Sequence, residues 1–131
     1  MADVQRLGSG GPWEDAVGYS RVVAVGDQAW TAGCTATVDG RVQHEGDAYR
    51  QALVAFGVAL DALVRAGFTP ADVVRTRMFL KHAGDADAVG RAHAELFGAV
   101  RPAATMVVVA GLVDPRMLVE VEVDAVRDPS P

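Results

Sequence analysis

The chain has 131 residues, of which 12 are basic and 17 acidic, so its formal net charge at pH 7 is −5. This length predicts a single domain over residues 1–131. Half of the residues are hydrophobic and 22% are charged, a balance that excludes a disordered chain, a collagen-like fibre and a disulfide-stapled miniprotein. The acidic balance argues against a nucleic-acid or anionic-membrane partner, because both require a concentrated positive surface.

The sequence favours a cytoplasmic location. Its one cysteine, Cys34, cannot form a disulfide within the chain, which suits a reducing compartment. Residues 1–15 contain no apolar stretch typical of a secretory signal. No apolar run approaches the roughly 18 residues that a membrane span requires.

The N-terminal third predicts a loop followed by a β-hairpin. Residues 1–18 are rich in glycine, and we expect them to be loop-like. Residues 21–25 and 28–32 favour strands, and the Gly-Asp dipeptide at 26–27 favours a tight turn between them. Gly33 follows the second strand, where glycine indicates a bulge or the close approach of another group.

Two segments have the apolar periodicity of helices. Residues 46–66 place apolar side chains on one helical face, and Gly67 and Pro70 end the segment. A second helix is expected from Asp85 or Asp87 to about Phe97. The expected inner side chains are Leu53, Phe56, Leu60 and Leu63 in the first helix, and Val89, Ala92, His93 and Leu96 in the second.

The C-terminal half predicts three strands and, with them, the fold class. Residues 71–80 and 118–126 alternate in polarity, whereas the apolar run 105–110 is typical of a strand buried on both faces. Residues 128–131 are expected to form a tail. The order β-β-α-β-α-β-β indicates an α+β sandwich, a mixed sheet with two helices on one face. Its other face carries Phe79 among charged residues, so we expect a second subunit to cover it.

Few residues carry a recognisable chemical motif. The sequence has no P-loop and no nucleophile elbow, and its three histidines (His44, His82 and His93) are too scattered to indicate a metal site. Cys34 is either a small buried hydrophobic residue or a thiol that lines a pocket. Tyr19 begins the first strand, where most tyrosines pack against the sheet edge.

Glu120 and Glu122 share one face of the last strand, and two interpretations remain open. Both could form ion pairs with Arg75 and Arg77 on another strand. Alternatively, one carboxylate faces a cleft and polarises a water molecule.

Several short segments between residues 17 and 127 form a recognisable pattern by their order and spacing. These are Gly18-Tyr19-Ser20, Val25-Gly26-Asp27, Thr31-Ala32-Gly33, residues 63–68 and 72–76, Leu96-Phe97-Gly98, Arg101-Pro102-Ala103 and Val119-Glu120-Val121-Glu122. With this pattern, residues 17–127 resemble the RidA/YjgF family of small enamine and imine deaminases.

The resemblance implies a chorismate-mutase-like two-layer sandwich that assembles as a homotrimer, with clefts for a small molecule between subunits. Members with the activity hydrolyse 2-aminoacrylate-type enamines and imines, and need no metal or organic cofactor. Tyr19 and Gly33 match the family's pocket tyrosine and strand-end glycine. Glu120 matches the catalytic glutamate that orients the attacking water.

Three matched positions depart from the family pattern. Ala104 stands at the position of the arginine that grips the substrate carboxylate, Gly90 at that of a pocket asparagine, and Met106 where some members have cysteine. Arg101, Arg75 and Arg77 are conceivable substitutes for the missing cation. The expected ligand-binding set is Tyr19, Gly33, Cys34, Gly90, Ala104, Thr105 and Met106.

Three functions therefore stay open for such a protein. The first is hydrolysis of an imine or enamine with an altered substrate preference. The second is a non-catalytic trimer that binds a small molecule, and the third is a true 2-aminoacrylate deaminase with a substitute cation. Some family members are labelled ribonucleases, but the acidic charge of this chain gives that activity little support.

Overall fold

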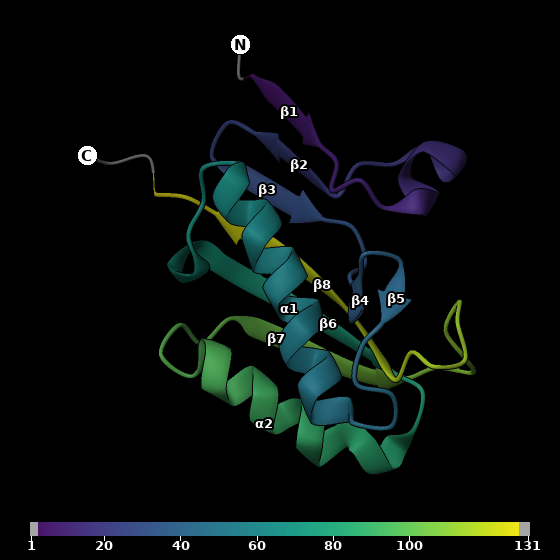
Figure 1. Cartoon of the computed structure of the whole chain (residues 1–131). Helices are drawn as coiled ribbons and strands as arrows, with labels where there is room; N and C mark the ends of the chain where they lie inside the picture. The colour runs from purple at the N-terminus through teal and green to yellow at the C-terminus, as the bar shows by residue number, and fades with distance from the viewer. Residues whose placement is uncertain (1–2, 129–131) are drawn as a thin grey trace.

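The computed structural model describes residues 3–128. A six-stranded mixed sheet has the order β1-β2-β3-β8-β6-β7, in which β6 and β7 are parallel and the other neighbours antiparallel. Two helices, α1 and α2, pack on one face of it (Figure 1). The expected α+β class with two helices on one face is confirmed. The strands are β1 Val4–Leu7, β2 Val22–Val25, β3 Gln28–Thr31, β6 Val73–Leu80, β7 Ala103–Val108 and β8 Val119–Val126, and the helices are α1 Ala48–Arg65 and α2 Ala86–Phe97.

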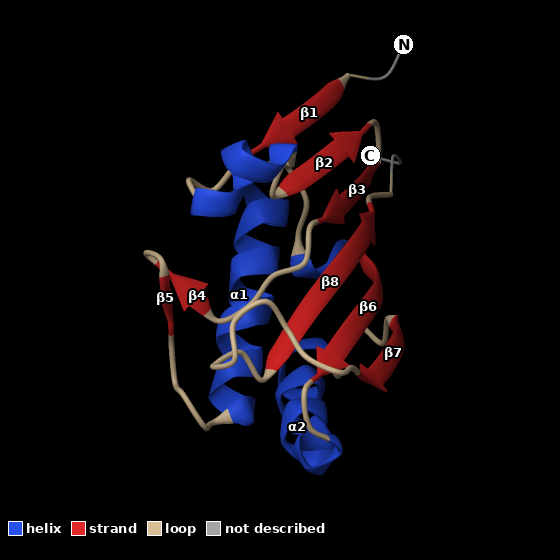
Figure 2. Cartoon of the chain, turned by 90° about the vertical axis from the view of Figure 1, so that its right-hand side faces the viewer, coloured by secondary structure: helices blue, strands red, loops and turns tan. Residues whose placement is uncertain are grey.

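The expected hairpin, the second helix and the last strand are all present. β2 pairs with β3 across the Gly26-Asp27 turn, and β8 buries every second side chain against the helices. A short separate hairpin joins β4, Thr37–Val38, to β5, Arg41–Val42, and lies apart from the main sheet (Figure 2). Among the described residues, no helix is both long and apolar enough to cross a bilayer.

Helix α1 packs on the sheet mainly through alanines, and not through the leucine face that the sequence predicts. Leu53 and Leu60 are only partly buried, whereas the alanines beside them are fully buried. Small side chains let the helix axis approach the strands, so the inner stripe is centred on alanine rather than on leucine. Its fully buried members include Ala52, Ala55, Phe56, Ala59, Ala62 and Leu63.

The alternation expected in residues 71–80 is broken at its beginning. Residues 70–72 form a short 3-10 turn before β6. The register against β8 then shifts between Val73 and Arg75. Val74 lies in this bulge and is exposed, whereas Val73 is buried in its place. From Thr76 onward the predicted alternation holds.

The expectation of a doubly buried strand at 105–110 is wrong. β7 lies at the edge of the sheet, pairs only with β6, and exposes most of its side chains. Val107 is 41% exposed and Val108 55% exposed. A single strand neighbour leaves one edge of the backbone and much of the side-chain surface uncovered by the described residues, although Met106 packs partly against the core.

The N-terminal segment is more regular than its glycines suggest. Val4–Leu7 forms β1, an edge strand paired with β2, and Glu14–Gly18 forms a π-helical turn, η1. A short strand that only extends the edge of a sheet has little apolar pattern of its own, so β1 could not be predicted from the sequence. The expected tail at 128–131 lies outside the described residues, except for Asp128.

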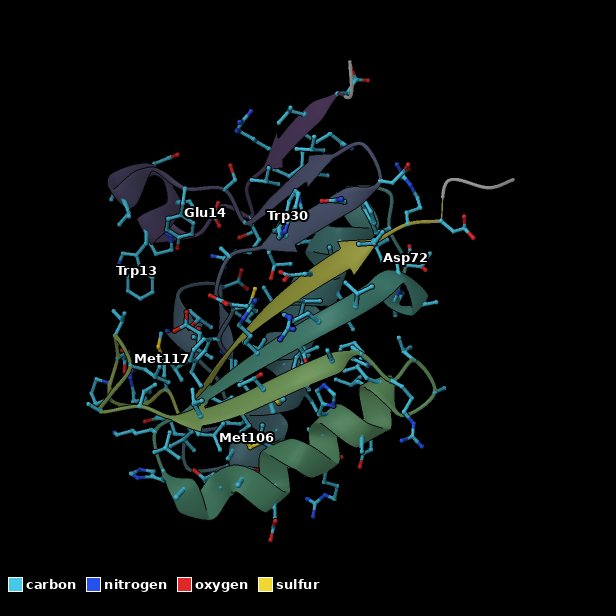
Figure 3. All side chains as sticks on the ribbon, turned by 180° about the vertical axis from the view of Figure 1, so that it is seen from behind. Trp13, Glu14, Trp30, Asp72, Met106 and Met117 are labelled. Atoms are coloured by element: carbon cyan, nitrogen blue, oxygen red, sulfur yellow. The ribbon has the colours of Figure 1, made fainter. Side chains whose placement is uncertain are left out.

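Within residues 3–128, no layer covers the sheet face opposite the helices, as expected (Figure 3). Arg77 bridges Glu122 and Asp124 there, with Nη1 3.8 Å and 3.2 Å from their carboxylate oxygens. This supports the ion-pair interpretation for Glu122. Among the described residues, no cation forms an ion pair with Glu120, so the two glutamates differ in surroundings.

Candidate active site

A cavity of about 530 Å³ lies where the N-terminal segment, the chain after β3, helix α1 and the loop before β8 meet. Tyr19, Gly33 and Glu120 all line it, although they are far apart in the sequence. Apolar side chains surround this polar group, among them Trp13 and Met117, which lie at the same end of the molecule (Figure 3). Its volume is within the range of small-molecule sites, roughly 300–1,000 Å³.

Gly33 makes room for the Glu120 carboxylate. Directly after Gly33 the chain pairs with β8 in an antiparallel bridge, in which Cys34 and Val121 exchange backbone hydrogen bonds of 2.8 Å and 2.9 Å. A Cβ atom added to Gly33 would overlap Glu120 Oε2. The strand-end glycine is therefore a close-approach position, as the sequence indicates, and the group that approaches is the glutamate.

The surroundings of Glu120 favour a proton-accepting carboxyl group. Burial is the main cause that raises its pKa above the ordinary value, and the nearby charge of Glu122 raises it further. The positive charge of Arg21 opposes both effects without cancelling them. A carboxylate whose pKa is shifted toward neutrality is a better general base than an ordinary exposed one.

Arg21 is the cavity residue that the sequence analysis missed. It is almost buried, and its Nη1 donates a 2.6 Å hydrogen bond to the carbonyl oxygen of Gly33. Its Nη2 lies 3.3 Å from Glu14 Oε2 and 3.5 Å from the Tyr19 hydroxyl. The spacing of Tyr19 and Arg21, two residues apart in an extended segment, was the available signal, because such side chains share a face.

Glu14 holds the η1 turn against Arg21. Ser9 donates to the Glu14 carboxylate from its backbone nitrogen at 2.8 Å and from its hydroxyl at 2.5 Å. Burial alone would raise the pKa of Glu14, but the hydrogen bonds from Ser9 and the charge of Arg21 lower it overall. Glu14 is therefore ionised at neutral pH and neutralises the Arg21 guanidinium.

Cys34 lies behind the cavity and is not one of its lining residues. The side chain is 1% exposed, and Arg21 Nη1 lies 3.6 Å from its sulfur. Burial raises the pKa of the thiol, and the guanidinium offsets only part of this effect. Cys34 thus remains a protonated, buried thiol, which matches the first of the two interpretations open for it.

The remaining candidate residues lie elsewhere in the chain. Gly90 is on α2, and Ala104, Thr105 and Met106 are on β7, which is separated from β8 by β6. Figure 3 shows Met106 with β7. None of these four residues lines the cavity that holds Glu120.

The three conceivable substitute cations also lie outside the cavity. Arg101 donates to the carbonyl oxygen of Gly98 at 3.0 Å, in the turn before β7. Arg77 is bound to the β8 carboxylates, and Arg75 projects from β6 beside them. Over residues 3–128, no group of three or more metal-ligating side chains is present.

Comparison with known proteins identifies the family. The family model described as Endoribonuclease L-PSP matches residues 13–127. A Mycobacterium tuberculosis protein, Rv2704, is described as a member of the YjgF/YER057c/UK114 family and is 40% identical. Its crystal structure superposes with a TM-score of 0.86 over 95% of this chain and 99% of that one.

The chain belongs to the YjgF/YER057c/UK114 family. An uncharacterised protein of Streptomyces coelicolor is 50% identical over 124 residues, covering 95% of this chain and 92% of its own length. A Pseudomonas aeruginosa protein of unknown function, PA3499, is 31% identical, with a TM-score of 0.84 over 98% of this chain and 95% of that one. The family resemblance stated from sequence segments is thereby confirmed.

Proposed function

We propose that the protein hydrolyses a small imine or enamine, with Glu120 as the residue that activates water. The observation that carries this proposal is the convergence of Tyr19, Gly33 and Glu120 on one cavity. Each of these three residues matches a pocket position of the family, and each comes from a different sequence segment. A half-buried carboxylate with a raised pKa at such a position suits proton transfer at neutral pH.

The reaction uses only water and the carboxylate. Glu120 accepts a proton from water while the water oxygen forms a bond to the carbon of the protonated C=N group. The C=N double bond becomes a single bond, and its electron pair moves to nitrogen. Glu120 returns the proton to nitrogen. The C–N bond then breaks with its electron pair on nitrogen while the hydroxyl oxygen forms the C=O bond and gives its proton to Glu120, so that a carbonyl compound and ammonia or an amine leave, and water takes the proton from Glu120.

We further propose that the site operates at the seam of a homotrimer. β7 has an unpaired edge and exposed apolar side chains, and the sheet face opposite the helices lacks a cover. Assembly through these surfaces would bury both and would bring β7 of a neighbouring copy to the cavity mouth. Ala104, Thr105 and Met106 would then enter the site from that copy, without the family's arginine. The cytoplasm, where Cys34 stays reduced, is the expected location.

The alanine at position 104 also keeps a second candidate function open, a trimer that binds a small molecule without turnover. The loss of a bidentate clamp on a substrate carboxylate removes orientation that hydrolysis of amino-acid imines needs. Ribonuclease activity is less favoured, because the cavity offers carboxylates where a phosphate backbone needs free cations.

The test is the release of ammonia and carbonyl compound from freshly generated imines, with and without a carboxylate. The wild-type protein should accelerate at least one substrate well above the rate without protein. Glu120→Gln should reduce that rate by roughly 100-fold, a typical contribution of a general base. Ala104→Arg should gain hydrolysis of 2-aminoacrylate.

The outcomes separate the alternatives. Binding without turnover in the wild type and in Ala104→Arg would favour the non-catalytic binder. Rapid wild-type hydrolysis of 2-aminoacrylate itself would favour the deaminase with a substitute cation. Equal rates for wild type and Glu120→Gln would contradict the role of this carboxylate.

A further inference from the structure

The only cation among the described residues that line the cavity is Arg21, and its donors are already committed. A guanidinium has five N–H groups. Nε donates to Ser9 Oγ at 3.4 Å, and Nη1 donates to Gly33 O and Cys34 Sγ at 2.6 Å and 3.6 Å. The two remaining groups, on Nη2, reach Glu14 and Tyr19. A ligand carboxylate could bind Arg21 only by displacing one of these partners.

The cavity also has an excess of negative charge. Glu14 neutralises Arg21, while Glu120 and Asp39, which both line the cavity, form no ion pair within residues 3–128. An anionic ligand would face two carboxylates without an ion-pair partner among the described residues, the exposed Asp39 and the half-buried Glu120, and a guanidinium already paired with Glu14. A cationic ligand would meet a half-buried carboxylate, where the attraction is stronger than in bulk water.

Besides the hydroxyl groups of Ser9, Thr35 and Thr37, the wall has an apolar part that includes an aromatic ring. It is contributed by several elements: the N-terminal segment, helix α1 and the loop before β8. A ligand that fills this part needs an apolar body, and the Trp13 indole is able to bind a cationic group over its face. The apolar lining residues are Pro12, Trp13, Val17, Val58, Val113 and Met117.

We infer that the ligand of this cavity carries a positively charged nitrogen and an apolar body, and lacks a carboxylate. Its nitrogen pairs with Glu120, and its body packs among the apolar residues. The inference rests on the proposed function for the site and narrows it to one substrate class, iminium ions derived from apolar amines. Such an iminium ion places its electrophilic carbon beside the carboxylate that activates water.

Three matched probes test this inference by isothermal titration calorimetry. 2-Phenylethylamine offers the ammonium and an apolar body, 3-phenylpropanoate offers a carboxylate and the same ring, and phenylalanine carries both groups. The amine should bind at least tenfold more tightly than the carboxylate. If 3-phenylpropanoate binds the wild-type protein more tightly than 2-phenylethylamine does, the inference is wrong. It is also wrong if none of the three probes binds.

Variants identify the pairing carboxylate. Glu120→Gln should weaken 2-phenylethylamine binding by roughly tenfold or more, since it removes a charge-assisted hydrogen bond. Glu95→Gln is the matched control, because its carboxylate lies on α2 outside the cavity, where it accepts a hydrogen bond from Tyr49, and binding should stay within about threefold. Equal losses in the two variants would contradict the pairing with Glu120.

These outcomes are independent of catalysis. Amine binding that depends on Glu120, together with no imine hydrolysis, would support the ligand class and contradict only the proposed activity. If hydrolysis is fastest for an imine that carries a carboxylate, the proposed activity is supported and the inferred ligand class is contradicted.

Discussion

Arg21 Nη1 donates a 2.6 Å hydrogen bond to the carbonyl oxygen of Gly33, the residue whose missing side chain leaves space for Glu120. One buried guanidinium thus holds the chain segment against which the candidate base lies. The same guanidinium holds η1 through Glu14. The position of Glu120 therefore depends on a network that reaches from Gly33 through Arg21 to Glu14.

Gly33→Ala should reduce imine hydrolysis, because the new Cβ must displace the Glu120 carboxylate. A displacement of about 1 Å in a reacting group costs on the order of 100-fold in rate. The measurement is kcat/KM for the best imine substrate, alongside the free energy of unfolding in urea.

Gly57→Ala is the control for this substitution. Gly57 lies within α1, and a Cβ there meets no atom within 4 Å. It should leave the rate unchanged and stabilise the fold by roughly 0.5–1 kcal/mol, since alanine is the better helix former. Unchanged hydrolysis in Gly33→Ala would mean that Glu120 is not the base.

Arg21→Met should destabilise the fold by about 3 kcal/mol, because it leaves the buried Glu14 carboxylate without its cation. Urea denaturation measures the loss. In the control, Arg50→Met, the removed ion pair with Asp47 is exposed, so the change should stay within about 0.5 kcal/mol. Similar losses in both variants would contradict a structural role for the buried pair.

His93 should make stability depend on pH. The imidazole contacts the rings of Phe56 and Phe97 and is hydrogen-bonded to Thr76 at 2.8 Å. Burial lowers its pKa below 6.5. The unfolded chain therefore binds more protons than the native protein just below pH 6.5, and the free energy of unfolding falls as the pH falls through this range.

The measurement is urea unfolding at about pH 7.5 and about pH 5.5 for the wild type and His93→Gln. The wild type should lose more stability on acidification than the variant, because groups other than His93 titrate equally in both. Identical losses would show that His93 is not the group responsible.

Val107→Lys on the exposed edge strand β7 should prevent assembly. Light scattering should give a wild-type mass near three times the chain mass of 13.7 kDa, and a mass near that of one chain for the variant. Val64→Lys, at an exposed position of α1, is the control and should remain assembled. A wild-type mass near 13.7 kDa would remove the proposed seam.

Local patterns predicted most of the fold because the hairpin, both helices and β8 each carry a complete signal of their own. β7 shows where such reasoning fails. Its apolar run predicts burial, but whether a strand is central or at an edge depends on pairing with distant strands. Val74 illustrates a smaller error of the same kind. The prediction assumed that successive side chains of a strand alternate between buried and exposed faces, and the bulge at Val74 reverses that alternation.

At the site, the sequence identified the residues that matched a family pattern, Tyr19, Gly33 and Glu120. It missed Arg21 because a lone arginine near a strand start is ordinarily solvated, and its burial depends on Glu14 and Ser9 in a segment expected to be a loop. Charge balance inside a cavity is a property of several segments together. Only the folded structure shows that every N–H donor of the Arg21 guanidinium already has a partner.

The most direct measurement of the central claim is a pair of crystal structures, one with 2-phenylethylamine and one with 3-phenylpropanoate, because each probe offers one of the two charges. We predict the ammonium of 2-phenylethylamine within hydrogen-bond distance of Glu120, the ring among the apolar residues, and Arg21 with all five of its present partners. We predict no 3-phenylpropanoate in the cavity, and its carboxylate bound to Arg21, with Glu14 or Tyr19 displaced, would contradict the claim.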